Sequence, residues 1–142
     1  MTDKVETKDG AQVDARRFGV RIAAASLILD AGFGVAMPIA LTHLDRTGEL
    51  PMTPWGFRAF SGPFEQLGRD RFAILGWSLV AVCALDVVAG VWLWRERRRG
   101  AILALATTPV AFSLAVGFAL PFMLLPAPIR AALIVAGRRN LR

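Results

Sequence analysis

The chain has few of the residues from which metal and redox sites are built: its 142 residues include one cysteine and one histidine. Cys83 cannot form an intrachain disulfide, and it fits no metal-ligand spacing. A single histidine, His43, excludes a bis-histidine haem or a multi-histidine metal site within one chain. The sequence also lacks a nucleophile–base pair, a glycine-rich phosphate loop and a haem motif. It therefore identifies no catalytic residue and no metal site, and an enzyme acting alone is the least favoured class.

Polar residues are also scarce. Hydrophobic residues make up 55% of the chain, and the mean hydropathy is +0.49, which is too apolar for an ordinary soluble domain of this size. The net charge of +6 raises the question of nucleic acid binding. The cations, however, cluster at the ends of apolar runs, as the positive-inside rule predicts. The sequence therefore predicts a membrane protein that does not bind nucleic acid.

Lysine is nearly absent: of the 17 Lys and Arg residues, only Lys4 and Lys8 are lysine. Together with the abundance of Ala, Val and Gly, this bias indicates a GC-rich bacterial genome. The first apolar run is too long for the hydrophobic region of a signal peptide, and it contains Asp30. We expect a multi-pass protein of the bacterial inner membrane that keeps this first run as a span.

Two apolar runs, 18–41 and 72–94, are long enough to cross a bilayer, which takes about 20 residues. Residues 1–17 are polar and are predicted to form a disordered cytoplasmic tail. The basic run 95–99 follows the second span and belongs in the cytoplasm. This places the N-terminus inside and the segment between the first two spans outside.

That outer segment, residues 42–71, is rich in proline and glycine and is nearly neutral in charge. Trp55 and three phenylalanines (Phe57, Phe60, Phe64) are predicted to form an element lying at the outer interface. His43 sits at the outer end of the first span, where polar capping is the favoured role. A quinone or proton site near the surface is the alternative.

Residues 101–137 allow two interpretations. In the preferred one, two short spans over 101–118 and 120–137 form a hairpin that turns around residues 117–122. In the other, one helix spans 101–125, and Pro126 opens a short helix on the outer face, which leaves the C-terminal arginines outside. The preferred fold is an all-α, four-helix transmembrane bundle with an extracytoplasmic segment between the first two helices.

Two aspartates lie inside the first two spans, and each costs about 2.5–3.5 kcal/mol at a helix centre. Asp86 and Arg130 lie at similar depths in the four-span arrangement, so we predict that they form an ion pair. The favoured role of this pair is to hold two helices in register.

Asp30 has no basic residue at its depth unless Arg130 reaches it. We therefore expect a neutral carboxyl that hydrogen-bonds to Thr107, Thr108 or Ser113. Ser26 lies on the same stripe of the first span. The alternative to a structural role is a proton-coupling or polar ligand site.

Thr107 and Thr108 precede Pro109, which cannot donate a hydrogen bond to the carbonyl of Leu105. A threonine hydroxyl is expected to help satisfy the freed backbone. A ligand groove at the resulting kink is the less favoured alternative.

The stretches Leu85–Trp94, followed by basic residues and Gly100, and Gly117–Phe122 resemble the DoxX-like group of small bacterial four-helix membrane proteins. The likeness covers roughly residues 71–142, and the long outer segment departs from it. The group takes its name from the small subunit of a thiosulfate–quinone oxidoreductase. The resemblance implies a four-span bundle near a quinone-linked complex, but no cofactor-binding residue of the group can be matched here.

Three functions stay open. The first is a non-catalytic subunit or accessory protein of a membrane complex, with a membrane protein partner or a second copy of the chain. The second is a small proton- or cation-coupled transporter or channel that uses Asp30 or Asp86. The third is a lipid or quinone binder, quinone being the one cofactor that stays open.

Overall fold

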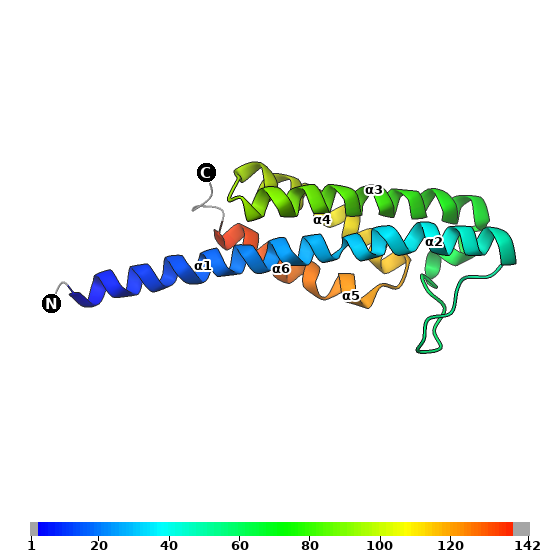
Figure 1. Ribbon diagram of the computed structural model, residues 1–142, viewed down its shortest axis with the longest axis horizontal. Helices are drawn as coiled ribbons and strands as arrows, with labels where there is room; N and C mark the ends of the chain where they lie inside the picture. Colours follow the sequence, from blue (N-terminus) through cyan, green and yellow to red (C-terminus); the bar gives the residue numbers. More distant parts are fainter. Residues whose placement is uncertain (1–2, 138–142) are drawn as a thin grey trace.

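The computed structural model describes residues 3–137, and it describes the side-chain surroundings of residues 12–120 and 123–137. Within them the chain is a bundle of helices with no β-strand; Met52 and Arg58 form an isolated antiparallel bridge. The predicted all-α bundle is confirmed (Figure 1). The helices are α1 (Asp3–Leu29), α2 (Ala31–Thr47), α3 (Arg69–Trp94), α4 (Arg98–Gly117), α5 (Pro121–Leu124) and α6 (Pro126–Gly137), with a 3₁₀ helix, η1 (Pro63–Leu67).

Helices α1 and α2 continue each other along one line, with Asp30 between them (Figure 1). Helix α1 begins at Asp3 and not at Phe18, so residues 3–17 of the predicted disordered tail are helical. That tail contains few apolar residues but many with good helix propensity, among them Glu, Lys, Gln, Ala and Arg. Helix α2 extends past Leu41 to Thr47, where Gly48 ends it with a φ of 75°.

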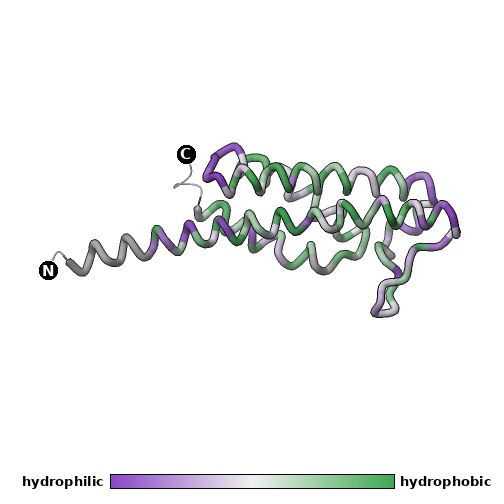
Figure 2. Tube along the Cα trace, viewed as in Figure 1, coloured by the Kyte–Doolittle hydropathy of each residue, from purple (hydrophilic) through white to green (hydrophobic). Residues whose placement is uncertain are grey.

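Three helical segments are long and apolar enough to cross a membrane: Gln12–Thr47, Arg69–Trp94 and Arg98–Gly117. Large apolar side chains are exposed on all of them, including Leu29, Ile74 and Ile102 at 67–76%. Exposed apolar surface of this extent is typical of contact with lipid. Figure 2 shows hydrophobic residues along the middle of the bundle and hydrophilic ones at its ends.

The last part of the chain, residues 121–137, returns along the bundle as two helices, α5 and α6. Helix α4 ends at Gly117, and Ala119 adopts a φ of 50° in the turn, where the N–H of Leu120 donates to the carbonyl of Ala115 at 2.8 Å. The chain therefore reverses where the hairpin interpretation predicts, and the single helix over 101–125 is wrong. The predicted span 120–137 is two helices, α5 and α6, because prolines at positions 121 and 126 each start a helix and disfavour helix in the residue before.

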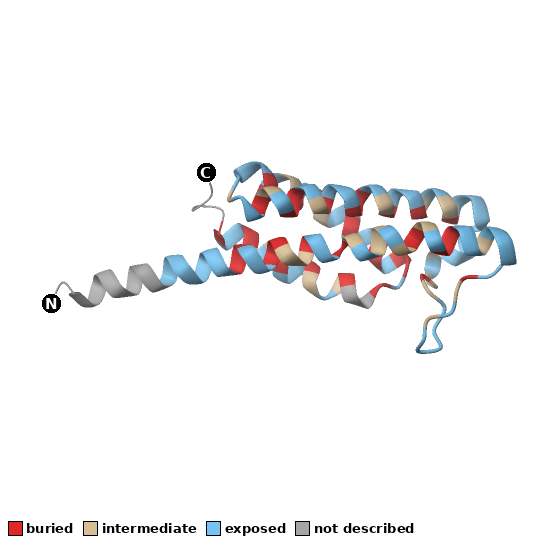
Figure 3. Ribbon diagram, in the orientation of Figure 1, coloured by how far each residue is buried: buried red, intermediate tan, exposed pale blue. Residues whose placement is uncertain are grey.

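Helix α3 packs against α1, α2 and α4, and α6 packs against α1 and α4. Buried positions lie on the facing sides of the helices (Figure 3). They form two apolar clusters. One lies near the loop end of the bundle, by which we mean the end that carries residues 48–68 between α2 and α3. It joins α2, α3, α4 and α5 around residues such as Met37, Leu79 and Phe118. The other joins α1, α3, α4 and α6 around Leu27, Leu93 and Ile134.

Candidate functional site

A layer of polar side chains separates the two apolar clusters. Asp30 lies at the junction of α1 and α2, Asp86 in α3, Thr107 in α4 and Arg130 in α6. Their exposed fractions are 4%, 0%, 7% and 3%. In α3, Cys83 belongs to one apolar cluster and Ala89 to the other, with Asp86 between them. We call these four residues the polar layer.

Arg130 bridges the two aspartates. Its Nη1 donates to Oδ2 of Asp30, and its Nη2 lies 3.4 Å from Oδ2 of Asp86. The Asp86–Arg130 pair predicted from helix depth is therefore present. A counter-ion for Asp30 depended on whether Arg130 reaches it, and Arg130 does contact it, so Asp30 is paired with a cation as well. Burial makes each charge costly unless it is paired, and here one guanidinium serves both carboxylates.

The threonines of α4 take different partners from those predicted. The hydroxyl of Thr107 donates to Oδ1 of Asp86 at 2.6 Å, and not to Asp30. The hydroxyl of Thr108 donates to the carbonyl of Ala104 at 2.6 Å, one residue before the carbonyl that Pro109 leaves free. The hydroxyl of Ser113 donates to the carbonyl of Pro109 at 2.9 Å. Thr107 therefore belongs to the polar layer, whereas Thr108 and Ser113 bond within their own helix.

The backbone around Asp30 stays close to helical. Its φ and ψ are −60° and −18°, and its N–H donates to the carbonyl of Ser26 at 3.2 Å. Its own carbonyl accepts from the N–H of Phe33 at 3.1 Å, a bond to the third residue ahead that tightens the turn locally. Four residues after Asp30, Gly34 lets α2 approach α3 so closely that an added Cβ would lie 2.9 Å from Cβ of Cys83. Small residues thus bring the two aspartate-bearing elements together.

The charge balance of the layer is uneven, with two carboxylates for one guanidinium. Nε of Arg130 is the one buried side-chain nitrogen or oxygen without a partner in the described part of the chain. All other buried polar side-chain atoms there are bonded, so the layer holds four elements together. In this arrangement the charged groups bind one another. One negative charge is left over, which one proton or one monovalent cation would neutralise.

A groove of about 470 Å³ opens on the surface of the bundle beside Asp30. Its lining is mostly apolar and combines α1, α2 and the start of α6: Ile22, Ala25, Ser26, Leu29, Asp30, Phe33 and Pro126. Asp30 borders this groove, although only 4% of its surface is exposed. Of the predicted candidates, Ser26 therefore lies near the layer, half-buried in the groove wall.

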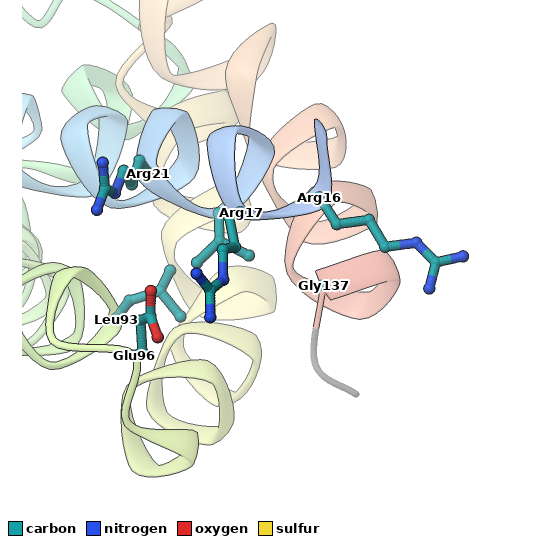
Figure 4. Close-up of a pocket in the computed structure, with 7 residues that line it drawn as sticks. Arg16, Arg17, Arg21, Leu93, Glu96 and Gly137 are labelled. Atoms are coloured by element: carbon teal, nitrogen blue, oxygen red, sulfur yellow. The ribbon is translucent and has the colours of Figure 1, made fainter. Parts of the chain in front are cut away.

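Two further hollows lie at the ends of the bundle. At the loop end, a cleft of about 410 Å³ is bordered by both charged and apolar residues, among them Glu49, Arg58, Glu65 and Arg69. At the opposite end, a small hollow lies beside Arg17, which points from α1 toward Leu93 and Glu96, while Arg16 points away (Figure 4). That second hollow has about 10 Å³ of space, about enough for one water molecule.

The two predicted interfacial residues, His43 and Trp55, do not belong to the polar layer. His43 is exposed near the end of α2, and its carbonyl accepts from the hydroxyl of Thr47 at 2.8 Å. Trp55 is 80% exposed in the loop between α2 and α3. Within residues 3–137, no group of three or more His, Cys, Asp or Glu residues is placed to hold a metal ion.

Sequence reasoning missed two ion pairs at the loop end. Nη2 of Arg69 lies 2.7 Å from Oδ1 of Asp45 and also contacts the carbonyl of Leu44, which ties the start of α3 to the end of α2. Nη1 of Arg58 lies 3.3 Å from Oε1 of Glu65. The charges were visible in the sequence, but nothing in their spacing fixes how the outer segment folds back.

In comparisons with known proteins, the chain matches no family model, no curated protein and no solved structure.

Proposed function

We propose that the chain is a non-catalytic subunit or accessory protein of a membrane complex. The observation that carries this proposal is the bridging of Asp30 and Asp86 by Arg130, with 6% or less of each of these side chains exposed. Ionisable groups that bind one another in a buried interior specify one arrangement of the helices, whether or not they add net stability. A scaffold role accounts for the polar layer without any reaction.

The surface that we assign to a partner is the cleft at the loop end. Its Arg58–Glu65 pair has side chains 52% and 41% exposed. Exposed pairs of this kind contribute about 0–1 kcal/mol to stability, so recognition is the better account of them. The partner is another membrane protein or a second copy of the chain. The DoxX-like resemblance of residues 71–142 favours a quinone-linked oxidoreductase of a bacterial inner membrane.

Polymer-bounded nanodiscs excised from native membranes test the proposal. The tagged chain at its native level should bring a stoichiometric partner or a second copy with it. Arg58→Glu should lose the partner. Arg58→Glu combined with Glu65→Arg restores an internal pair with reversed polarity, and it should still lose the partner if the cleft charges are recognised. Nanodiscs that contain one copy of the chain and lipid alone would contradict the proposal.

A proton- or cation-coupled transporter is the second candidate, favoured by the surplus of one carboxylate over the guanidinium in the polar layer. One bound proton or monovalent cation would neutralise that surplus. Purified protein in vesicles with an internal pH dye distinguishes the two functions. A scaffold leaves an imposed pH gradient intact, whereas a transporter dissipates it and loses this activity in Asp30→Asn or Asp86→Asn.

A lipid or quinone binder is the third candidate, favoured by the apolar groove beside Asp30. Its volume of about 470 Å³ falls within the usual range of small-molecule sites. Ala25→Phe would place a ring in the groove. If the groove holds a quinone or a specific lipid, mass spectrometry of extracts from the purified protein should show that molecule in the wild type and not in Ala25→Phe.

A further inference from the structure

The aromatic residues of the outer segment divide into two sets. Phe60 and Phe64 turn inward, against Phe118 in the turn after α4, with ring centroids 6.1 and 5.2 Å from it in edge-to-face arrangements. Trp55 and Phe57 turn outward and are 80% and 73% exposed, as is the neighbouring Met52 at 74%. The prediction that all four aromatic residues lie at the interface is therefore wrong for Phe60 and Phe64, because the bundle supplies a partner for them.

The outward set lies on a hairpin with a defined backbone. The N–H of Thr53 donates to the carbonyl of Phe57 at 2.7 Å, and the hydroxyl of Thr53 donates to the same carbonyl at 2.8 Å. The N–H of Ala59 donates to the carbonyl of Pro51 at 2.8 Å. These bonds satisfy backbone groups that would otherwise be costly away from water. The Phe60–Phe118 contact fixes the base of the hairpin to the bundle, so its tip is held in one direction.

Figure 1 shows that direction: the hairpin leaves the bundle sideways, across the line of α2 and α3. Its tip does not extend beyond the end of the bundle, so it lies alongside the apolar helices and not above them. The lipid-facing surface of α3 continues toward this end with Ile74 and Trp77, which are 67% and 58% exposed. The tip is therefore placed next to the membrane leaflet at the loop end.

The tip carries no charge. From Pro51 to Phe57 the sequence is Pro-Met-Thr-Pro-Trp-Gly-Phe, and the flanking charges are Glu49 before it and Arg58 after it. A charged group would resist entry into the region of the acyl chains. An uncharged tip with a tryptophan is suited to the boundary between headgroups and acyl chains, where the indole ring is preferred.

We propose that Met52, Trp55 and Phe57 insert into the headgroup–acyl boundary of the leaflet at the loop end and anchor the outer segment to the bilayer. The inserted tip fixes the outer segment from its side and leaves the cleft that contains Arg58 and Glu65 free. This anchor does not depend on the scaffold, transporter or binder role of the polar layer.

Tryptophan fluorescence with brominated lipids tests the anchor. A protein with Trp55 alone is obtained by replacing Trp77, Trp92 and Trp94 with Phe. It is placed in vesicles of phosphatidylcholine and phosphatidylglycerol, with bromines either near the headgroup end or near the tail end of the acyl chains. We expect blue-shifted emission and a greater loss of emission with the shallow bromines than with the deep ones.

A protein with Trp77 alone is the matched control, because Trp77 faces outward from a spanning helix. Its emission should fall when the bromines lie in the acyl chains at the depth of Trp77. If the triple replacement does not fold, the difference in emission between wild type and Trp55→Phe gives the same measurement.

Two outcomes would overturn the anchor. Red-shifted emission that iodide quenches and bromines do not would place Trp55 in water. Blue-shifted emission that neither bromines nor iodide quench would place it under a second copy or another protein.

Discussion

The hydroxyl of Thr107 lies 2.6 Å from Oδ1 of Asp86, so that a residue of α4 completes the environment of a carboxylate on α3. Arg130 approaches the other oxygen of the same group at 3.4 Å. Asp86 is thus bonded from two helices besides its own, and each contact occupies a different oxygen. This arrangement makes the threonine a part of the ionic network.

Thr107→Val should therefore destabilise the bundle. The substitution keeps the shape of the side chain but leaves a buried carboxylate oxygen without its donor, which costs about 1–3 kcal/mol. Thr108→Val is the matched control, because its hydroxyl bonds only to the carbonyl of Ala104 in its own helix. Denaturation with sodium dodecyl sulfate, followed by far-ultraviolet circular dichroism, measures both. Equal losses for the two variants would contradict a special role for Thr107.

The stability of the polar layer should depend on how many carboxylates remain to pair with Arg130. Asp30→Asn or Asp86→Asn alone leaves one carboxylate for Arg130 and should change the unfolding free energy by only about 1 kcal/mol. The double variant leaves the guanidinium without an anion and should lose about 3–5 kcal/mol. The same detergent titration measures the coupling, and Asp45→Asn at the exposed pair is the control. A double loss equal to the sum of the single losses would show that the two aspartates act independently.

Gly34 and Gly32 should respond differently to alanine. Both lie in α2, but an added Cβ at Gly34 would meet Cβ of Cys83 at 2.9 Å, whereas at Gly32 it meets nothing within 4 Å. Gly34→Ala should push α2 from α3, at a cost of about 1–3 kcal/mol. Gly32→Ala should be neutral or stabilising. Combining Gly34→Ala with Cys83→Gly removes the Cβ and the thiol that the new methyl group would meet, so the double variant should lose less than the sum of the two single losses; additive losses would contradict the contact.

Phe118 should control the order of the outer segment. Its ring is fully buried and meets the rings of Phe60, Phe64 and Phe72 edge to face. Phe118→Ala should cost about 3–5 kcal/mol and release residues 48–68 from the bundle. Limited proteolysis in vesicles should then cut this segment faster than in the wild type. Phe112→Ala, at a side chain 43% exposed, is the control and should leave the cutting rate unchanged.

The orientation predicted from the arginines is checked with single cysteines in a Cys83→Ser background. Gln66→Cys, at an exposed position of η1 outside the hairpin tip, should react with a membrane-impermeant maleimide in intact cells. Arg97→Cys, in the basic turn between α3 and α4, should react only after the membrane is opened. The reverse pattern would place the outer segment in the cytoplasm and would contradict the topology.

The sequence predicts how far along a helix a residue lies better than it predicts which neighbouring helix its side chain faces. Counting residues from helix ends was enough to predict the Asp86–Arg130 pair and the turn near Gly117. It left the pair between Arg130 and Asp30 open, because that contact depends on which side of α6 meets α1. The inward turn of Phe60 and Phe64 was missed for the same reason. Their partner, Phe118, lies more than fifty positions away, and only the closed bundle brings the three rings together.

Differences at helix ends come from local chemistry that apolar patterns do not describe. The start of α1 at Asp3 follows from helix propensity in a polar stretch, where a search for burial expects no order. Pro121 and Pro126 mark the two helices of residues 121–137, but the apolar composition of this segment suggested one continuous span.

The guanidinium of Arg130 reaches carboxylates on two different elements, and this has a consequence for how the helices find their alignment. In lipid, apolar helix surfaces have no hydrophobic driving force between them, so close packing and polar contacts set their alignment. A slide of α6 by one turn, about 5.4 Å, would carry the guanidinium away from both partners and leave three unmatched charges in the interior. The penalty falls on every misaligned arrangement at once, so the ionic contact selects one pairing of the helices as they assemble in the membrane.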